Sequence, residues 1–313
     1  MTGRRSGVGR TSGATQLTKF AFLASALVFA AVGMIASRRI AARARAAVSE
    51  NSAEAAPLTY LGFDTNTYPG DDALPGLKKT FSFSGYWLNP PPGATENTWS
   101  GKREVVRKNG FGFLVLFNGR TERQLKSPVD LAALGRADAE AAAESAGREG
   151  FPDHTVIFLD QEEGGRMTAA QMAYISSWIA RVMSRHFYAG IYCSGIPFKE
   201  GGGESIVTAD DIRARVSVPN LSFFVYNDSC PPSLGCVYSK AAPAPSLSGV
   251  KYARVWQFAQ SPRRREVTRA CSATYNPDGN CYAPNLPMGG AMTVDLDSAT
   301  SPDPSNASQV RVD

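Results

Sequence analysis

The 313-residue chain is poor in histidine, with two in all, and it lacks the usual cofactor motifs. His154 and His186 are not spaced with the cysteines in the way that zinc ligands are. The sequence has neither a phosphate-binding loop nor the glycine fingerprint of dinucleotide-binding folds. We therefore expect no cofactor and no metal site.

The positive charge of the chain is concentrated at its N-terminus. The formal net charge is +5. No acidic residue precedes Glu50, so no negative charge in the first segment offsets its basic residues. The remainder of the chain is slightly acidic. Overall charge therefore gives no support for nucleic-acid binding, and we expect no nucleic-acid partner.

A long apolar run occupies residues 20–37, after the basic segment 1–19. It lies at the short end of the roughly 17–25 residues that span a bilayer. An uncleaved signal anchor and a cleaved secretory signal both fit this pattern, but the arginines directly after the run make poor cleavage flanks and favour the anchor. We expect a hydrophobic helix that attaches the protein to the membrane, followed by a linker over residues 38–57.

Four of the five cysteines fall in two closely spaced pairs. Cys230 and Cys236 bracket one loop, and Cys271 and Cys281 bracket another. Such pairs indicate disulfides, which persist in an oxidising compartment, with free thiols as the alternative. We expect a disulfide across each loop and an extracytoplasmic location, although spacing leaves other connectivities open. Cys193 lies in an apolar strand and is expected to be a small buried residue.

From residue 58 onward, short apolar runs alternate with helical patterns. Helices are expected over 137–150, over 168–187 with Thr168 as cap, and over 208–216 with Thr208 as cap. Eight runs have the composition of strands: 59–66, 81–89, 112–119, 156–162, 188–195, 221–228, 253–260 and 291–298.

This alternation predicts an α/β fold with a parallel sheet. Eight strands in about 240 residues predict a (β/α)₈ TIM-type barrel over residues 58–300. The barrel is expected to be irregular near 229–252, where prolines and a cysteine loop replace a helix. Residues 301–313 have the composition of a disordered tail.

The fourth predicted strand ends in three carboxylates within four positions, Asp160, Glu162 and Glu163. Asp160 and Glu162 are two residues apart, so they point to the same side, with α-carbons about 6–7 Å apart. Side chains at that spacing reach the carboxyl separations of about 5–9 Å used in glycoside hydrolysis. Adjacent like charges raise one another's pKa, which suits acid–base chemistry, while a solvated loop or a cation site is the alternative reading.

Other strand ends carry polar side chains, and in a barrel these ends surround one mouth. Asp64 ends the first strand and Asp295 belongs to the last, so acids from three separated strands are expected in one cleft as catalytic candidates. Each residue alone is more often a turn or packing residue. The substrate-binding candidates beside the acids are Asn118, Tyr192, Asn227, Trp256 and Gln257.

The motifs GFDTN (62–66), FLDQE (158–162), GIYCSG (190–195), RVWQFAQ (254–260) and TVDLD (293–297) occur in this order. In that order they resemble family 25 glycoside hydrolases, the lysozyme-type muramidases, and more closely their bacterial glycoside hydrolase-like relatives.

The resemblance implies that Glu162 is the general acid and that Asp160 is its partner. It also implies flanking roles for Asp64 and Asp295, and a sugar-binding face with Tyr192 and Trp256. One departure is Asp297, which stands where muramidases usually carry asparagine.

Three functions follow as hypotheses. The first is an exported glycan hydrolase acting on peptidoglycan or a related cell-envelope polysaccharide. The second is a non-catalytic carbohydrate-binding pseudoenzyme, and the third is an envelope scaffold on the same barrel. In each case we expect a monomer in the cell envelope.

Overall fold

The computed structural model describes residues 58–126, 130–239 and 241–308. The segments predicted at 1–19, 20–37 and 38–57 lie outside the described residues. Among the residues that are described, no helix has the length and apolarity needed to cross a membrane.

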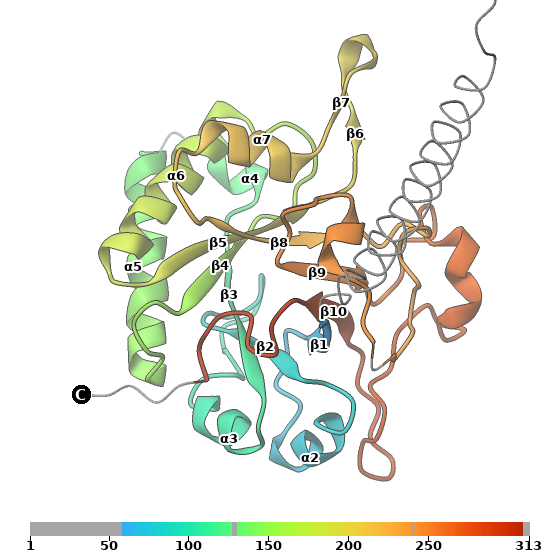
Figure 1. Ribbon diagram of the computed structural model, residues 1–313. Coiled ribbons are helices and arrows are strands. Elements are labelled where there is room, and N and C mark those ends of the chain that lie inside the picture. The colour runs from blue at the N-terminus through green and yellow to red at the C-terminus, as the bar shows by residue number, and fades with distance from the viewer. Residues whose placement is uncertain (1–57, 127–129, 240, 309–313) are drawn as a thin grey trace, which may run out of the picture. The chain divides into compact units, whose positions relative to one another are not determined.

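Eight strands close into a barrel, as the sequence predicts (Figure 1). Their order around the barrel is β1-β10-β9-β8-β5-β4-β3-β2. The strands are β1 (Tyr60–Asp64), β2 (Phe83–Trp87), β3 (Gly112–Asn118), β4 (Val156–Asp160), β5 (Tyr188–Ser194), β8 (Ser222–Tyr226), β9 (Val255–Ala259) and β10 (Asp295–Ala299). The α/β class and the barrel are therefore confirmed.

One strand departs from the all-parallel expectation. β10 runs antiparallel to both of its neighbours, β1 and β9. Asp295, the first residue of β10, consequently pairs with Asp64, the last residue of β1. Asp297 pairs with Gly62 and lies two positions deeper in the barrel. The reversal brings the start of the last strand, rather than its end, to the mouth.

Glycines on two strands make room for phenylalanine rings inside the barrel. A Cβ atom on Gly62 would lie 2.1 Å from the ring of Phe83, and one on Gly190 would lie 2.4 Å from the ring of Phe158. Both approaches are far inside van der Waals contact, so neither position accepts a side chain. These buried rings fill the barrel interior at the level of Gly62 and Gly190.

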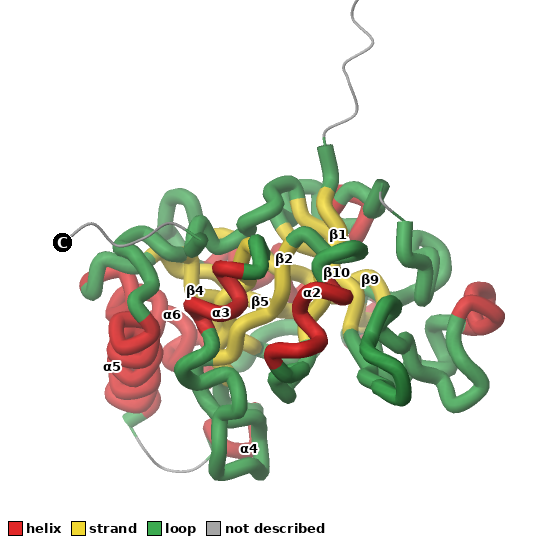
Figure 2. The backbone as a smooth tube through the Cα atoms, turned by 90° about the horizontal axis from the view of Figure 1, so that it is seen from below, coloured by secondary structure: helices red, strands yellow, loops and turns green. Residues whose placement is uncertain are grey.

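Helices α5 (Leu131–Glu149) and α6 (Ala169–Ser184) pack together on the outside of the barrel (Figure 2). Thr168 caps α6 as predicted, in a capping box with Gln171. The cap predicted at Thr208 is wrong, because α7 (Thr208–Arg215) has Val207 at that position and Thr208 instead donates to the carbonyl of Gly165. The remaining α-helices are α2 (Leu74–Leu77), α3 (Arg103–Lys108) and α4 (Glu122–Leu125).

Between β5 and β8 the chain forms a two-stranded hairpin, β6 (Phe198–Lys199) and β7 (Ser205–Ile206). Figure 1 shows it projecting away from the barrel. Short 3₁₀ turns complete the elements, at Asp71–Ala73, Gly201–Gly203, Pro245–Ser248 and Arg269–Thr274.

The predicted disordered tail is wrong for residues 301–308, which pack against the lower end of β3. The Asp303 carboxylate accepts from the backbone N–H of Phe113 at 2.9 Å, and the Ser305 hydroxyl accepts from the N–H of Val115 at 2.8 Å. Ala307 is fully buried. The polar side chains of this stretch thus accept hydrogen bonds from backbone N–H groups of β3. Residues 309–313 lie outside the described part.

The four loop cysteines form disulfides, but not within their own loops. Cys230 bonds Cys271, and Cys236 bonds Cys281, so both bridges join the two loops to each other. The expected pairing was wrong because the loops lie side by side beyond β8 and β9, which the linear spacing does not show. Cys193 is a buried free thiol, as expected.

We expect peptide mapping without reduction to recover cross-linked peptides that join 230 to 271 and 236 to 281. Replacing Cys236 and Cys281 together by serine should lower the free energy of unfolding by about 2–5 kcal/mol, because each bridge restrains a long loop of the unfolded chain. Urea denaturation measures this loss. Recovery of peptides linked within either loop would contradict the pairing.

Candidate active site

A polar hollow of about 100 Å³ opens at the mouth of the barrel. It brings together four acids from three strands or their ends: Asp64 of β1, Asp160 and Glu162 at the end of β4, and Asp295 of β10. A second, smaller hollow of about 30 Å³ shares Asp160 and Glu162 with it. The other residues lining the main hollow are Asn66, Trp87, Pro92, Leu116, Asn118, Tyr192, Phe224, Gln257 and Gln260.

Gln257, on β9, connects the acids of two neighbouring strands. Its side-chain N–H₂ group donates to Asp64 at 2.8 Å and to Asp295 at 3.4 Å. Its carbonyl oxygen accepts from the hydroxyl of Tyr192 at 2.7 Å and from Gln260 at 2.8 Å. Every polar atom of this amide is thus used, so the amide holds both carboxylates at fixed positions.

The end of β4 separates three carboxylates into different environments. Asp160 is partly buried, and its Oδ1 has no hydrogen-bond partner in the described part of the chain. Glu162 is exposed at the mouth. Glu163 instead accepts from the backbone N–H of Glu122 at 2.5 Å and from the Gln161 side chain, so it holds the start of α4. Glu163 is therefore engaged in structure.

Burial and mutual repulsion shift these acids in the same direction. Burial raises the pKa of Asp64 to about 6, although the hydrogen bond from Gln257 opposes the shift. Burial, followed by the charges of Glu162 and Asp64, raises the pKa of Asp160 well above its ordinary value. Burial also raises the pKa of Asp295. Glu162 is open to solvent on one side, but the walls of the hollow remove part of the water around its carboxyl group, and this loss, followed by the charge of Glu163, raises its pKa as well. The hollow therefore retains protons that exposed carboxyls would lose.

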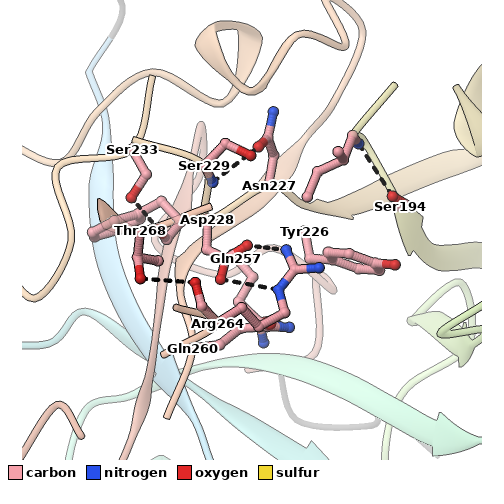
Figure 3. A network of polar contacts seen from close by, with 12 residues as sticks. Ser194, Tyr226, Asn227, Asp228, Ser229, Ser233, Gln257, Gln260, Arg264 and Thr268 are labelled. Carbon is pink, nitrogen blue, oxygen red and sulfur yellow. Dashed lines mark hydrogen bonds and ion pairs between the residues drawn. The ribbon is translucent and has the colours of Figure 1, made fainter. Parts of the chain in front are cut away.

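A polar network beside the hollow joins Asp228 to Arg264, whose guanidinium lies next to the ring of Tyr226 (Figure 3). Asp228 is fully buried and accepts two hydrogen bonds from Arg264, whose side chain is 32% exposed. The Arg264 guanidinium lies 5.2 Å from the ring centroid of Tyr226. The hydroxyl of Tyr226 donates to the carbonyl of Glu162 at 2.8 Å. The ion pair between Arg264 and Asp228 thus holds the guanidinium against the ring of Tyr226, and the Tyr226 hydroxyl in turn fixes the loop that carries Glu162.

Two predicted substrate-binding residues lie elsewhere. Trp256 is fully buried on the opposite face of β9 from Gln257, and its indole N–H donates to the carbonyl of Asn227 at 2.9 Å. Asn227 is buried as well and donates to the carbonyl of Ser248 at 2.6 Å. Alternation along β9 explains the error, because only one of two adjacent residues can face the interior.

Three contributing residues were missed by sequence reasoning. Gln260 lines the hollow and donates to Gln257, while Tyr226 and Arg264 hold the Glu162 loop. For Gln260 a signal was present, since it closes the RVWQFAQ motif. No local pattern marked Tyr226 or Arg264, which act through contacts with distant segments.

The acids do not form a recognisable metal site. Among the described residues, no group of three or more histidines, cysteines or acids has an arrangement that could hold a metal ion. The acids instead face an amide, a tyrosine hydroxyl and one another, which suits the placement of protons.

Residues 87–214 match the family model of the Rv2525c-like, glycoside hydrolase-like domain. The match confirms the resemblance read from the motifs, and it includes Asn118, Asp160, Glu162 and Tyr192. Asp64, Gln257 and Asp295 lie outside the matched stretch and join the site through the closure of the barrel. No curated protein matches the chain.

Solved structures of similar fold come from several bacteria. A protein of B. stearothermophilus is 18% identical with a TM-score of 0.48, covering 77% of this chain and 95% of that one. The Tat-secreted protein Rv2525c of Mycobacterium tuberculosis is 13% identical with a TM-score of 0.44, covering 80% and 100%. The Clostridium perfringens spore cortex lytic enzyme SleM is 14% identical with a TM-score of 0.45, covering 78% and 68%.

Replacing Arg264 by methionine should destabilise the fold by about 3–5 kcal/mol, because Asp228 would remain buried without a partner. Urea denaturation measures this loss. Adding Asp228→Asn to Arg264→Met should recover part of the stability, whereas Arg265→Met, at an exposed position, should change it by less than about 0.5 kcal/mol. Equal stability of the Arg264 and Arg265 variants would refute the proposed bracing.

Replacing Asp160 by asparagine should raise stability more at pH 7 than at pH 4. The folded protein raises the pKa of Asp160, so the native state binds the proton more tightly than the unfolded chain does. The resulting cost to folding grows as pH rises above the unfolded pKa, by at most about 1.4 kcal/mol per pH unit, and asparagine avoids it.

Denaturation of both proteins at the two pH values measures the difference. The exposed variant Asp72→Asn is the control and should show no such trend. A stability difference between Asp160→Asn and wild type that stayed constant or shrank with pH would contradict the assignment.

Proposed function

We propose that the protein hydrolyses glycosidic bonds of a cell-envelope polysaccharide, with peptidoglycan as the first candidate. The observation that carries this proposal is the convergence of Asp64, Asp160, Glu162 and Asp295 in one hollow. These acids come from segments far apart in the sequence, and each has a raised pKa. Carboxyls that hold protons beside carboxylates are what glycoside hydrolysis requires.

Glu162 is the proposed general acid. It is the most exposed of the four acids and borders both hollows, so its proton can reach a glycosidic oxygen lying across the mouth. Its raised pKa keeps the acid protonated at higher pH than an ordinary glutamate, and that proton is lost as pH rises through the raised pKa.

Asp160 lies deeper and is the proposed partner of Glu162. The charge of Glu162 adds to burial in disfavouring ionisation of Asp160. After the pair has lost one proton, the remaining negative charge faces the sugar ring and stabilises positive charge that develops during bond cleavage.

The polar lining of the hollow matches a sugar better than an apolar ligand. Hydroxyl groups of a saccharide can pair with Asn118, Gln260 and Asp64, whose positions the surrounding hydrogen bonds fix. The buried rings of Trp87 and Phe224 also line the hollow.

The two disulfides support a location in an oxidising compartment, which is where an envelope polysaccharide is found. Membrane attachment through residues 20–37 and a monomeric state stay predictions.

Glycan binding without hydrolysis is the second candidate. It is favoured by the size of the main hollow, because about 100 Å³ is less than the 300 Å³ or more of typical ligand pockets. A saccharide would then lie across the mouth, in contact with Glu162 but not seated over Asp160.

Incubation of the purified protein with cell-wall sacculi, followed by measurement of new reducing ends, tests the hydrolase proposal. Glu162→Gln should reduce the rate by at least about 100-fold, because glutamine cannot supply the proton. The matched control is Glu144→Gln on the outer face of α5, which should retain the wild-type rate.

Binding of the same sacculi by co-sedimentation separates the two candidates. Wild type that binds but releases no reducing ends would favour the binding function. Wild type that neither binds nor hydrolyses sacculi, or a Glu162→Gln variant that hydrolyses them at the full rate, would overturn the hydrolase proposal.

A further inference from the structure

Asp297 is a buried acid that the proposed chemistry does not use. Its side chain is fully inaccessible to solvent, and no N–H or hydroxyl group in the described part of the chain donates to either of its oxygens. A carboxylate in that setting would lose its hydration without any compensating hydrogen bond, which is among the costliest arrangements a protein can hold.

The strand register places Asp297 directly below the acids of the hollow. Asp295 and Asp297 are two residues apart on β10, so both point into the barrel. Asp297 pairs with Gly62 on β1, which contributes no side chain. Asp64, two residues further along β1 on the same inner face, contacts the carboxyl group of Asp297.

Two carboxyl groups can share a hydrogen bond only when one of them carries a proton. Asp64 already accepts from Gln257 at 2.8 Å, which favours its ionised form. Asp297 receives no such donor, because the amide of Gln257 is taken up by Asp64, Asp295, Tyr192 and Gln260. The proton of the pair therefore belongs on Asp297.

We propose that Asp297 is a protonated carboxyl group that donates its O–H to Asp64 and so positions that carboxylate at the wall of the hollow. Asp297 then serves as a neutral donor, as the isosteric amide of an asparagine would. It is a positioning residue, since it faces Asp64 and does not line the hollow itself.

The charged groups around the pair agree with this placement. Asp64 is faced by Asp295 and Asp297 on β10, by Asp160 on β4 and by Glu162 just beyond it, and Asp297 is faced by Asp64 and Asp295. All of these neighbours are acids, so none stabilises a charge on Asp297. Burial raises the pKa of Asp297 well above its ordinary value, in the direction that the proposal requires.

This proton placement does not depend on the proposed hydrolase activity, and its test needs no turnover. The full-length protein, labelled with ¹³C at the aspartate carboxyl groups, is titrated by NMR from pH 4 to pH 8. The resonance lost in Asp297→Asn and the resonance lost in Asp64→Asn identify the two groups. We expect the Asp297 resonance to keep the protonated shift throughout, and the Asp64 resonance to titrate near pH 6.

Two variants then separate donation from packing. Asp297→Asn retains an N–H donor and should leave the titration midpoint of Asp64 within about half a pH unit of wild type. Asp297→Leu has the same branched shape but no donor, and should raise that midpoint by about one unit or more. The exposed variant Asp72→Asn is the control and should alter neither resonance.

An Asp297 resonance at the ionised shift at pH 7 would overturn the proposal, and so would a midpoint of Asp64 that is the same in the leucine and asparagine variants. If the leucine variant does not fold, the wild-type titration and the asparagine variant still decide. In thermal denaturation the advantage of Asp297→Asn over wild type should widen as pH rises from 5 to 8, since only the aspartate must be kept protonated on folding.

Discussion

The antiparallel placement of β10 between β1 and β9 is the constraint on which the site depends. It puts Asp295 opposite Asp64 and lets a single amide, Gln257, donate to both carboxylates. In a parallel last strand, the first residue Asp295 would lie at the opposite end of the barrel from Asp64, and Gln257 could not donate to both. The reversal also places Asp297 beneath the hollow, out of reach of water, where a neutral acid is far less costly than a charged one.

The hollow collects acids, and none of the described residues that line it is a cation. Arg264 is committed to the buried Asp228 and contacts the site through the ring of Tyr226 and the backbone of Glu162. The acids are therefore stabilised by hydrogen bonds and by retained protons, and not by ion pairs. Because no neighbouring cation in the described part of the chain lowers their pKa values, the acids keep protons at the mouth, whereas ion-paired carboxylates would lose them.

Much of the fold could be read from the sequence, because strand periodicity and helix caps are local. All eight barrel strands lie where apolar runs predict them, and Thr168 caps α6 as its spacing with Gln171 indicates. Failures occurred where distant contacts decide. Residues 301–308 have the composition of a disordered tail, but in the structure they accept hydrogen bonds from backbone N–H groups of β3. Trp256 was predicted to contact sugar, but its side chain points to the outer face of β9.

The sequence by itself determined the eight strands, the acids near their ends and the resemblance to glycoside hydrolase-like domains, since each of these depends on short stretches of consecutive residues. Only the tertiary structure decided the direction of β10, the pairing of the cysteines across two loops and the proton relation of Asp297 to Asp64. These features depend on which segments meet when the barrel closes. That choice is made by the burial of side chains from the whole chain at once, and not by any one stretch of it.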